Sequence, residues 1–175
     1  TKAAQRFDED KGFAFSTYAV PLIIGEIQRF LRDDGMVHIS RKIQDDARKI
    51  ANIREKYKIK SNDIVIAYAG RIIKEKGVFE LIKAFQYVRK SINRECKLML
   101  IGASWYSDAT KKADYQKKVF DEAKKIGSDI IFTGYIDNSI LPEYLAAADI
   151  LVYPSLWQEP FGLTIVEGMC TGKPV

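Results

Sequence analysis

The fold of this chain is decided by residues 63–102, which read DIVIAYAGRIIKEKGVFELIKAFQYVRKSINRECKLMLIG. A short apolar run at 64–69 is followed by a loop and by a segment of helical periodicity at 77–91, and a second apolar run begins at 98. Short, continuously apolar strands that alternate with amphipathic helices are typical of a parallel sheet covered on both faces. We therefore expect an α/β fold.

The same alternation continues towards the end of the chain. Further apolar runs at 130–133 and 150–153 each precede a loop, and the segments of helical periodicity that follow the last three runs lie at about 109–126, 141–148 and 162–170. This pattern predicts a doubly wound, Rossmann-like parallel sheet, a fold that binds ligands at the carboxyl ends of its strands. Pro174 and Val175 resemble the start of a fifth strand, so we expect the chain to be a fragment of a longer protein.

Residues 1–62 have a different character from the rest of the chain. Their periodicity predicts one helix at 21–33, with Pro21 in its first turn, and a second that begins after an N-cap at Ser40. We therefore divide the chain into a mixed, helical leading segment at 1–62 and a nucleotide-binding α/β domain at 63–175 that is truncated at its C-terminus.

The positive charge of the chain is concentrated in the leading segment. The net charge is +5, and residues 1–62 hold 13 Lys and Arg against 9 Asp and Glu. Because acids are interspersed among these bases, the pattern favours a solvated helical surface over a nucleic-acid interface. We expect no nucleic-acid partner, and a weak attraction to an anionic membrane surface remains open.

Composition excludes several other classes of protein. No apolar run approaches the roughly 20 residues that span a bilayer, and no secretory signal is visible. Cys96 and Cys170 lie in apolar segments, which predicts reduced core thiols and a cytoplasmic location, with membrane-peripheral contact as a variant. With one histidine and no Cys/His cluster, we expect no metal site.

The loop after the first predicted strand carries two cations between glycines. Gly70 lets a ligand approach the backbone, Arg71 and Lys76 supply positive charge, and Gly77 precedes a helix N-terminus. Cations beside a positive helix end at the carboxyl edge of a sheet indicate an anion site. The alternative is a pair of solvated loop cations.

A second motif follows the fourth predicted strand and pairs two carboxylates. Glu159 lies in the loop, and seven residues separate it from Glu167. The backbone N–H groups of residues 161–163 lie where the next helix starts, which suits a phosphate or sugar oxygen. Glu167 can accept two hydrogen bonds from a ribose diol, or it is an ordinary acid near a helix start.

Together these motifs resemble the nucleotide-sugar half of a GT-B glycosyltransferase of the large retaining family 4 type, the glycosyl transferases group 1. The matching residues run in family order: Gly70-Arg71 with Glu75-Lys76-Gly77, Leu100-Ile101-Gly102, Phe132-Thr133-Gly134, Ala148-Asp149 with Pro154-Ser155, Glu159-Pro160-Phe161-Gly162 through Glu167, and Gly172-Lys173-Pro174-Val175.

The resemblance implies an enzyme that transfers a sugar with retention of its anomeric configuration and needs neither a metal nor a cofactor. The implied donor is a UDP-, GDP- or ADP-sugar, and the implied role is in polysaccharide or glycolipid biosynthesis. It implies that Arg71 and Lys76 hold the diphosphate as leaving group, and that Glu167 holds the ribose. The implied contacts to the transferred sugar and distal phosphate are Glu159 and the amides of Phe161, Gly162 and Leu163. Those to the base come from Tyr135, Ile136 and Asp137.

The chain also lacks parts that such a transferase has. The N-terminal, acceptor-binding domain is missing, and residues 1–57 match no motif of the family. We therefore expect the isolated fragment to be inactive. Two alternatives stay open, a non-catalytic module that binds nucleotide sugar and an interaction protein with no nucleotide site.

Overall fold

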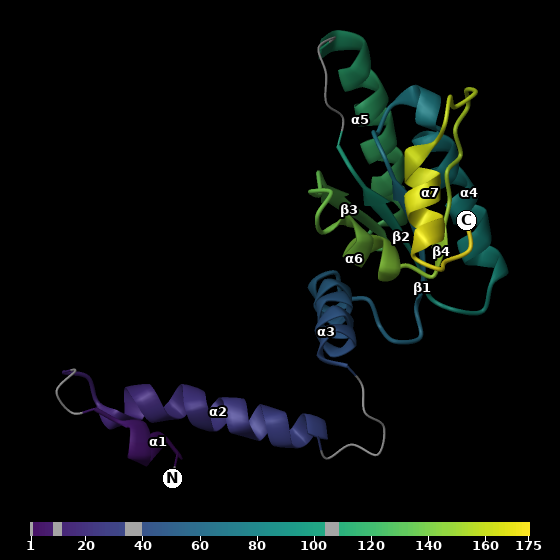
Figure 1. Cartoon of the computed structure of the whole chain (residues 1–175). Helices are drawn as coiled ribbons and strands as arrows, with labels where there is room; N and C mark the ends of the chain where they lie inside the picture. The colour runs from purple at the N-terminus through teal and green to yellow at the C-terminus, as the bar shows by residue number, and fades with distance from the viewer. Residues whose placement is uncertain (1, 9–11, 34–39, 104–108) are drawn as a thin grey trace. The chain divides into compact units, whose positions relative to one another are not determined.

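The computed structural model describes residues 2–8, 12–33, 40–103 and 109–175 (Figure 1). The chain forms two compact units, Thr1–Asp45 and Asp46–Val175. The larger unit contains all four strands and most of α3 (Arg41–Lys56).

The first unit is built from α1 (Lys2–Arg6) and α2 (Phe15–Asp33). Phe7 packs edge-on against Phe13 and Phe15, with ring centroids 6.2 and 5.1 Å apart. α2 starts at Phe15, six residues before Pro21, and therefore holds this proline in its interior. The prediction of Pro21 in the first helical turn is therefore wrong, and the helix tolerates the loss of one backbone donor.

The second unit is a four-stranded sheet with the order β3-β2-β1-β4 and parallel pairing throughout. Its strands are β1 (Ile64–Ala69), β2 (Cys96–Ile101), β3 (Ile130–Gly134) and β4 (Ile150–Leu151). The connecting helices are α4 (Val78–Ser91), α5 (Ala109–Ile126), α6 (Leu141–Ala146) and α7 (Leu163–Cys170), with a 3-10 turn at Lys74–Lys76. The predicted doubly wound parallel sheet is confirmed.

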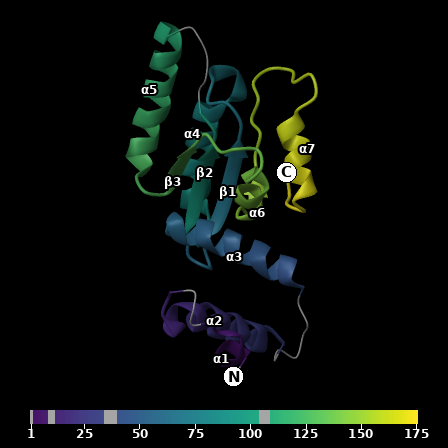
Figure 2. The same ribbon diagram turned by 60° about the vertical axis from the view of Figure 1, so that its left-hand side comes forward.

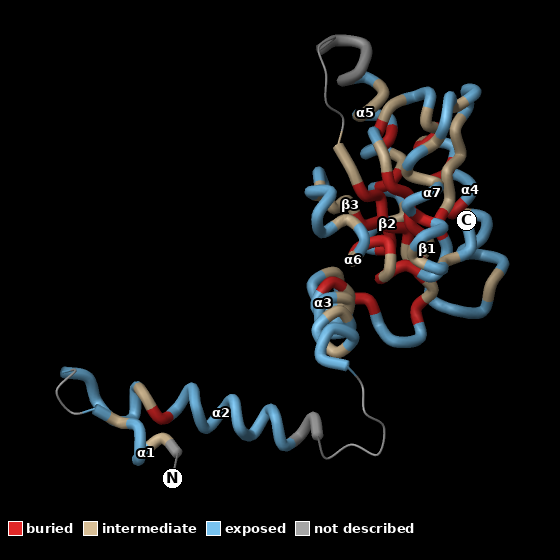
Figure 3. The backbone as a smooth tube through the Cα atoms, viewed as in Figure 1, coloured by how far each residue is buried: buried red, intermediate tan, exposed pale blue. Residues whose placement is uncertain are grey.

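Helices cover both faces of this sheet (Figure 1, Figure 2). One core forms where Tyr68, Leu98 and Leu100 meet the buried side chains of α4 and α5. Val65 and Met99 point to the opposite face, where they pack with buried residues of α3 and α6. In Figure 3 the buried residues, drawn in red, therefore follow the strands. This is expected when the side chains of a strand alternate between two covered faces.

The last turns of α3 belong to the second unit and pack on its core. Ile53 is buried in the core, and the Arg54 guanidinium donates hydrogen bonds to the carbonyl oxygens of Ala147 (2.9 Å) and Lys60 (3.0 Å). These contacts explain why the compact units divide at Asp45/Asp46, whereas the sequence pattern changes at residue 62.

The two cysteines lie in different environments. Cys96 is buried in β2, as predicted, whereas Cys170 is exposed at the end of α7, and both thiols are free. The prediction that Cys170 is a core residue is wrong, because α7 presents this side to solvent together with Met169.

The C-terminal residues lie beside β4. The backbone N–H of Leu151 donates to the carbonyl oxygen of Pro174 at 2.9 Å, although residues 174–175 are not part of a regular strand. The predicted fifth strand is therefore present as a single backbone hydrogen bond next to the sheet edge.

Candidate functional site

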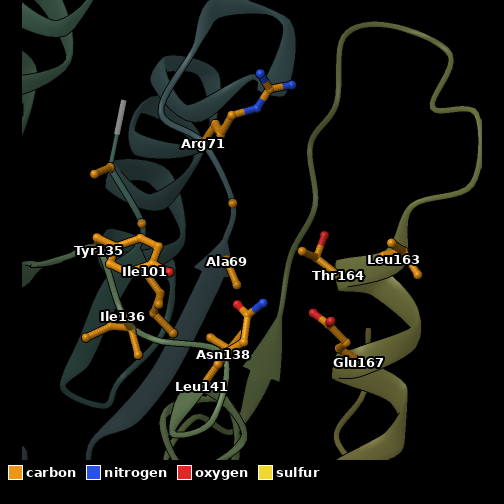
Figure 4. A pocket seen from close by; sticks show the side chains of 13 residues that line it. Ala69, Arg71, Ile101, Tyr135, Ile136, Asn138, Leu141, Leu163, Thr164 and Glu167 are labelled. Atoms are coloured by element: carbon orange, nitrogen blue, oxygen red, sulfur yellow. The ribbon is translucent and has the colours of Figure 1, made fainter. Parts of the chain in front are cut away.

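A cleft of about 620 Å³ opens at the carboxyl edge of the sheet (Figure 4). Its floor is formed by the ends of β1 and β2, and one wall comes from the segment after β3, which includes Ile136 and Asn138. The other wall is the start of α7, with Thr164 and Glu167. The site thus lies where a doubly wound sheet binds its ligands.

Two charged side chains of opposite sign line this cleft. Glu167 points from α7 into the space between the walls, and Arg71 extends from the end of β1 away from Glu167 (Figure 4). The cleft therefore offers an acceptor for hydroxyl groups in its interior and a cation at its rim.

A second, smaller hollow adjoins the cleft and shares Ala69 and Thr164 with it. Here the Lys76 ammonium forms an ion pair with Glu159, and the Ser155 hydroxyl donates to the same carboxylate oxygen, Oε1, at 2.6 Å. Fewer than a fifth of the Lys76 and Glu159 side-chain surfaces are exposed, 18% and 19%. The loop carboxylate is therefore fixed in place beside the cleft.

Gly77 allows the two loops that carry this ion pair to approach each other. It has φ +67°, and a Cβ at this position would lie 2.0 Å from the carbonyl oxygen of Pro154. A further backbone hydrogen bond, Leu156 N–H to the Glu75 carbonyl, joins the same loops at 2.8 Å. Only a residue without a side chain fits this contact.

The Lys76–Glu159 ion pair makes the free energy of unfolding depend on pH. The hydrogen bond from Lys76, followed by that from Ser155, holds the pKa of Glu159 below its usual value of 4.5. The unfolded chain binds this proton at higher pH than the folded chain, so the stabilisation is present above about pH 4.5 and is lost as the pH falls through the folded pKa. We expect Glu159→Gln to remove this part of the pH dependence.

Urea unfolding of both proteins between about pH 7 and about pH 3 measures the effect. The wild-type and Glu159→Gln curves should converge as the pH falls. Curves that stay parallel would show that the carboxylate contributes no differential proton binding.

Glu167 is positioned by close packing of α7 on the sheet. A Cβ on the next residue, Gly168, would lie 2.7 Å from Leu151 Cδ1 and 2.9 Å from the Tyr153 hydroxyl. Among the described residues this buried hydroxyl has no hydrogen-bond partner, and its burial, with a smaller contribution from the Glu167 charge, raises the pKa of Tyr153 to about 12. Tyr153 therefore stays neutral and sets the depth at which α7 sits.

We expect Gly168→Ala to push α7 away from the sheet. Overpacking of this kind costs about 1–3 kcal/mol of the free energy of unfolding, and displacing Glu167 should also weaken any ligand that it holds. Urea unfolding and a nucleotide titration measure the two effects. The control is Met169→Ala, because Met169 is 63% exposed on the same helix; equal effects from both variants would refute the packing argument.

The structure gathers most of the predicted site residues. Gly70, Arg71, Tyr135, Ile136, Leu163 and Glu167 line the cleft, and Lys76, Glu159 and Gly162 line the hollow beside it. Phe161 is 73% exposed and lines neither space. Asp137 also lines neither, because its carboxylate accepts hydrogen bonds from the backbone N–H and hydroxyl of Ser139.

Sequence reasoning missed five polar side chains of this region, Tyr68, Asn138, Tyr153, Ser155 and Thr164. Ser155 and Thr164 lie inside the motif around Glu159, so their polar side chains were a usable signal. Within the described residues, no three His, Cys, Asp or Glu side chains gather to hold a metal ion. The expected independence from metal stays a prediction.

Comparison with known families divides the chain in two. Residues 49–175 match the family model described as glycosyl transferases group 1. Residues 1–36 match a different model, Sigma-70 region 2.

Similar proteins follow the same division. The lipopolysaccharide 1,2-N-acetylglucosaminetransferase of Salmonella typhimurium is 37% identical over 124 residues, 71% of this chain and 32% of that protein. The structure of HepE from Anabaena in complex with UDP and glucose aligns with a TM-score of 0.62 and 26% identity, covering 73% of this chain and 32% of HepE. The chain thus spans about a third of the length of these relatives.

The leading residues resemble another kind of protein. The RNA polymerase sigma-F factor of Bacillus licheniformis is 52% identical over 54 residues, which is 31% of this chain and 21% of that protein. The match to Sigma-70 region 2 explains why residues 1–36 carry no motif of the glycosyltransferase family. The prediction that residues up to 57 lie outside this family is wrong for residues 49–57, because the family model begins at residue 49.

Proposed function

The chain belongs to the glycosyl transferases group 1 family, and we propose that its second unit holds the nucleoside diphosphate sugar from which a sugar is transferred. The predicted resemblance to the C-terminal domain of a GT-B glycosyltransferase is confirmed by the family match and by the likeness to HepE. The observation that carries the proposal is the position of Arg71 and Glu167 in one cleft, beside the Lys76–Glu159 pair.

The charges of the site suit a diphosphate leaving group. Negative charge develops on the diphosphate as the glycosidic bond breaks, and fixed cations stabilise that charge. In the proposal Arg71 at the rim and Lys76 in the hollow perform this role. Lys76 has three N–H donors, so it can keep its bond to Glu159 while it binds a phosphate oxygen.

The two carboxylates suit the two sugars that flank the diphosphate, the ribose and the transferred sugar. Glu167 inside the cleft accepts hydrogen bonds from the ribose diol in this proposal, and Glu159 contacts the transferred sugar. Gly162, with φ +72°, precedes the first turn of α7. The backbone N–H groups near residues 161–163 are proposed to bind the distal phosphate and sugar oxygens.

We propose a uridine nucleotide as the donor, supported by the UDP in the HepE complex. Retention of anomeric configuration and independence from metal are part of the same proposal and rest on family resemblance. Proton NMR of the product made by a longer parent protein, with and without EDTA, tests both features; an inverted anomer or lost activity in EDTA would contradict them.

We propose that the 175-residue chain binds the donor without turning it over, because it spans only about a third of its relatives. The test is a titration with UDP, GDP and ADP, followed by an assay for sugar transfer and donor hydrolysis. Saturable UDP binding without turnover supports a binding module, and turnover supports an active transferase. No response to any of the nucleotides would favour an interaction protein with no nucleotide site.

We propose a cytoplasmic location with peripheral membrane contact, and a role in polysaccharide or glycolipid biosynthesis. Two free thiols and the lipopolysaccharide transferase among the relatives support this proposal. Among the described residues, no helix has the length and apolar character needed to cross a bilayer. Cell fractionation and sedimentation with anionic vesicles test the location and the contact.

The first unit supports a second candidate function, contact with RNA polymerase. The supporting observations are the match of residues 1–36 to Sigma-70 region 2 and the 52% identity of the chain to a sigma-F factor over 54 residues. Size-exclusion chromatography of the full chain with bacterial core RNA polymerase tests it, and separate elution would contradict it. The prediction that the chain binds no nucleic acid stays open, and adding a DNA fragment to the same experiment tests it.

A further inference from the structure

The turn after β3 holds one amide side chain at the wall of the cleft. The Asp137 carboxylate accepts hydrogen bonds from the Ser139 N–H at 2.9 Å and from its hydroxyl at 2.6 Å. The Asp137 carbonyl oxygen also accepts from the N–H groups of Ile140 (3.1 Å) and Leu141 (3.0 Å). Asp137 therefore fixes the turn, and Asn138 is the residue of this turn whose polar side chain lines the cleft.

The surroundings of Asn138 are apolar and well supported. Ile136 and Leu141 line the cleft on the same wall, and both pack against the buried core of the sheet. Figure 4 shows the Asn138 amide reaching from this wall towards the side of the cleft where Glu167 lies. Among the described residues no hydrogen bond occupies this amide. This end of the cleft thus combines apolar side chains with the donor and acceptor of the Asn138 amide, which suits a flat heterocycle with a polar edge.

We propose that Asn138 reads the hydrogen-bonding edge of the uracil in the proposed donor. This inference rests on the proposed function, in which Glu167 holds the ribose and Arg71 the diphosphate, because the Asn138 wall then faces the remaining part of the nucleotide. The amide presents an acceptor, Oδ1, and a donor, Nδ2, side by side. Uracil presents the matching N3–H donor beside a carbonyl acceptor.

The same chemistry gives a direct way to change the preference. A carboxylate at this position offers two acceptors and no donor. It matches the adjacent N1–H and N2–H donors of guanine, whereas one of its oxygens would face a carbonyl oxygen of uracil. Guanine also presents a donor beside an acceptor, N1–H and O6, to which the amide can bind. Asn138→Asp therefore removes the match to uracil and keeps a match to guanine, without a change in side-chain size.

The experiment compares UDP, GDP and pyrophosphate binding to the full chain by ligand-observed NMR titration. We expect Asn138→Ala to weaken UDP by about threefold to tenfold, and Asn138→Asp to lower the ratio of UDP to GDP affinity by about tenfold or more. Pyrophosphate, which has no base, corrects for the added charge. Asn93→Asp is the matched control, since Asn93 is an exposed residue after α4 and lines neither the cleft nor the hollow.

The outcomes distinguish the role of Asn138 in base recognition from the proposed binding of a nucleotide sugar in the cleft. If wild type binds UDP in the cleft but Asn138→Asp leaves the UDP to GDP ratio as it is in Asn93→Asp, the role of Asn138 is wrong and the proposed function stands. If the wild-type chain binds neither UDP nor pyrophosphate, the proposed function is wrong, and the role of Asn138 is wrong with it. Retained melting temperatures confirm that the variants are folded.

Discussion

Replacing Gly77 with alanine is expected to lower the free energy of unfolding of the sheet unit by about 3 kcal/mol or more. The left-handed conformation of this residue, φ +67°, costs an alanine about 1–2 kcal/mol. The new methyl group would also meet the Pro154 carbonyl oxygen at 2.0 Å, and forcing a close-packed contact apart costs a further 1–3 kcal/mol, roughly. Urea unfolding followed by fluorescence measures the loss.

Gly127→Ala is the matched control for this prediction. Gly127 also has a left-handed conformation, φ +83°, but a Cβ there would meet nothing within 4 Å. Its replacement should therefore cost only the conformational part, about 1–2 kcal/mol. If the two variants lose the same stability, the contact between the Gly77 and Pro154 loops contributes nothing, and the position of the Lys76–Glu159 pair needs another cause.

Replacing Arg71 with alanine is expected to weaken UDP binding by about tenfold or more. A charge-assisted hydrogen bond contributes about 1.5–3 kcal/mol net, and about 1.4 kcal/mol corresponds to a factor of ten. Among the described residues no ion pair occupies the Arg71 guanidinium, so the variant should lose affinity without losing stability. Calorimetric titration with UDP measures the change, and Arg71→Lys should fall between wild type and alanine because it keeps the charge but not the bidentate geometry.

The control for Arg71 removes a cation elsewhere on the unit. Arg94 donates to the carbonyl oxygen of Asn62 on the loops before β1 and β2, away from the cleft at the strands' carboxyl ends. Arg94→Ala should leave UDP affinity within about twofold of wild type, since long-range attraction between exposed charges is screened at physiological salt. A loss as large as that of Arg71→Ala would indicate a general effect of net charge.

Much of the fold could be predicted from the sequence because its strands are buried on both faces. The run at 64–69 is fully apolar, and it forms β1 with the predicted ends. β4 covers only Ile150–Leu151, although apolar character continues to Tyr153. Pairing shortens here because β4 hydrogen-bonds a regular strand on one side only, and Pro154 then ends the extended segment.

The site was predictable where chemistry follows from position along the chain. Arg71 follows the carboxyl end of β1, and Glu167 lies in α7, the helix after β4, so the fold brings both to the same edge of the sheet. The pairing of Lys76 with Glu159, 83 residues apart, depends on the Gly77–Pro154 contact, which no local pattern encodes. Family resemblance pointed to Tyr135, Ile136 and Asp137 for the base. The structure shows instead that the Asp137 carboxylate binds Ser139 within its own turn and that the next residue, Asn138, lines the cleft.

The central claim is that a nucleoside diphosphate binds in the cleft at the carboxyl edge of the sheet. A titration of the ¹⁵N-labelled chain with UDP, followed by amide chemical shifts, locates the binding site residue by residue. We predict saturable shifts at Gly70, Gly102, Ile136 and Thr164, which line the cleft. Shifts confined to the basic surface of Arg89, Lys90 and Lys125, which line a separate pocket between α4 and α5, would contradict the claim.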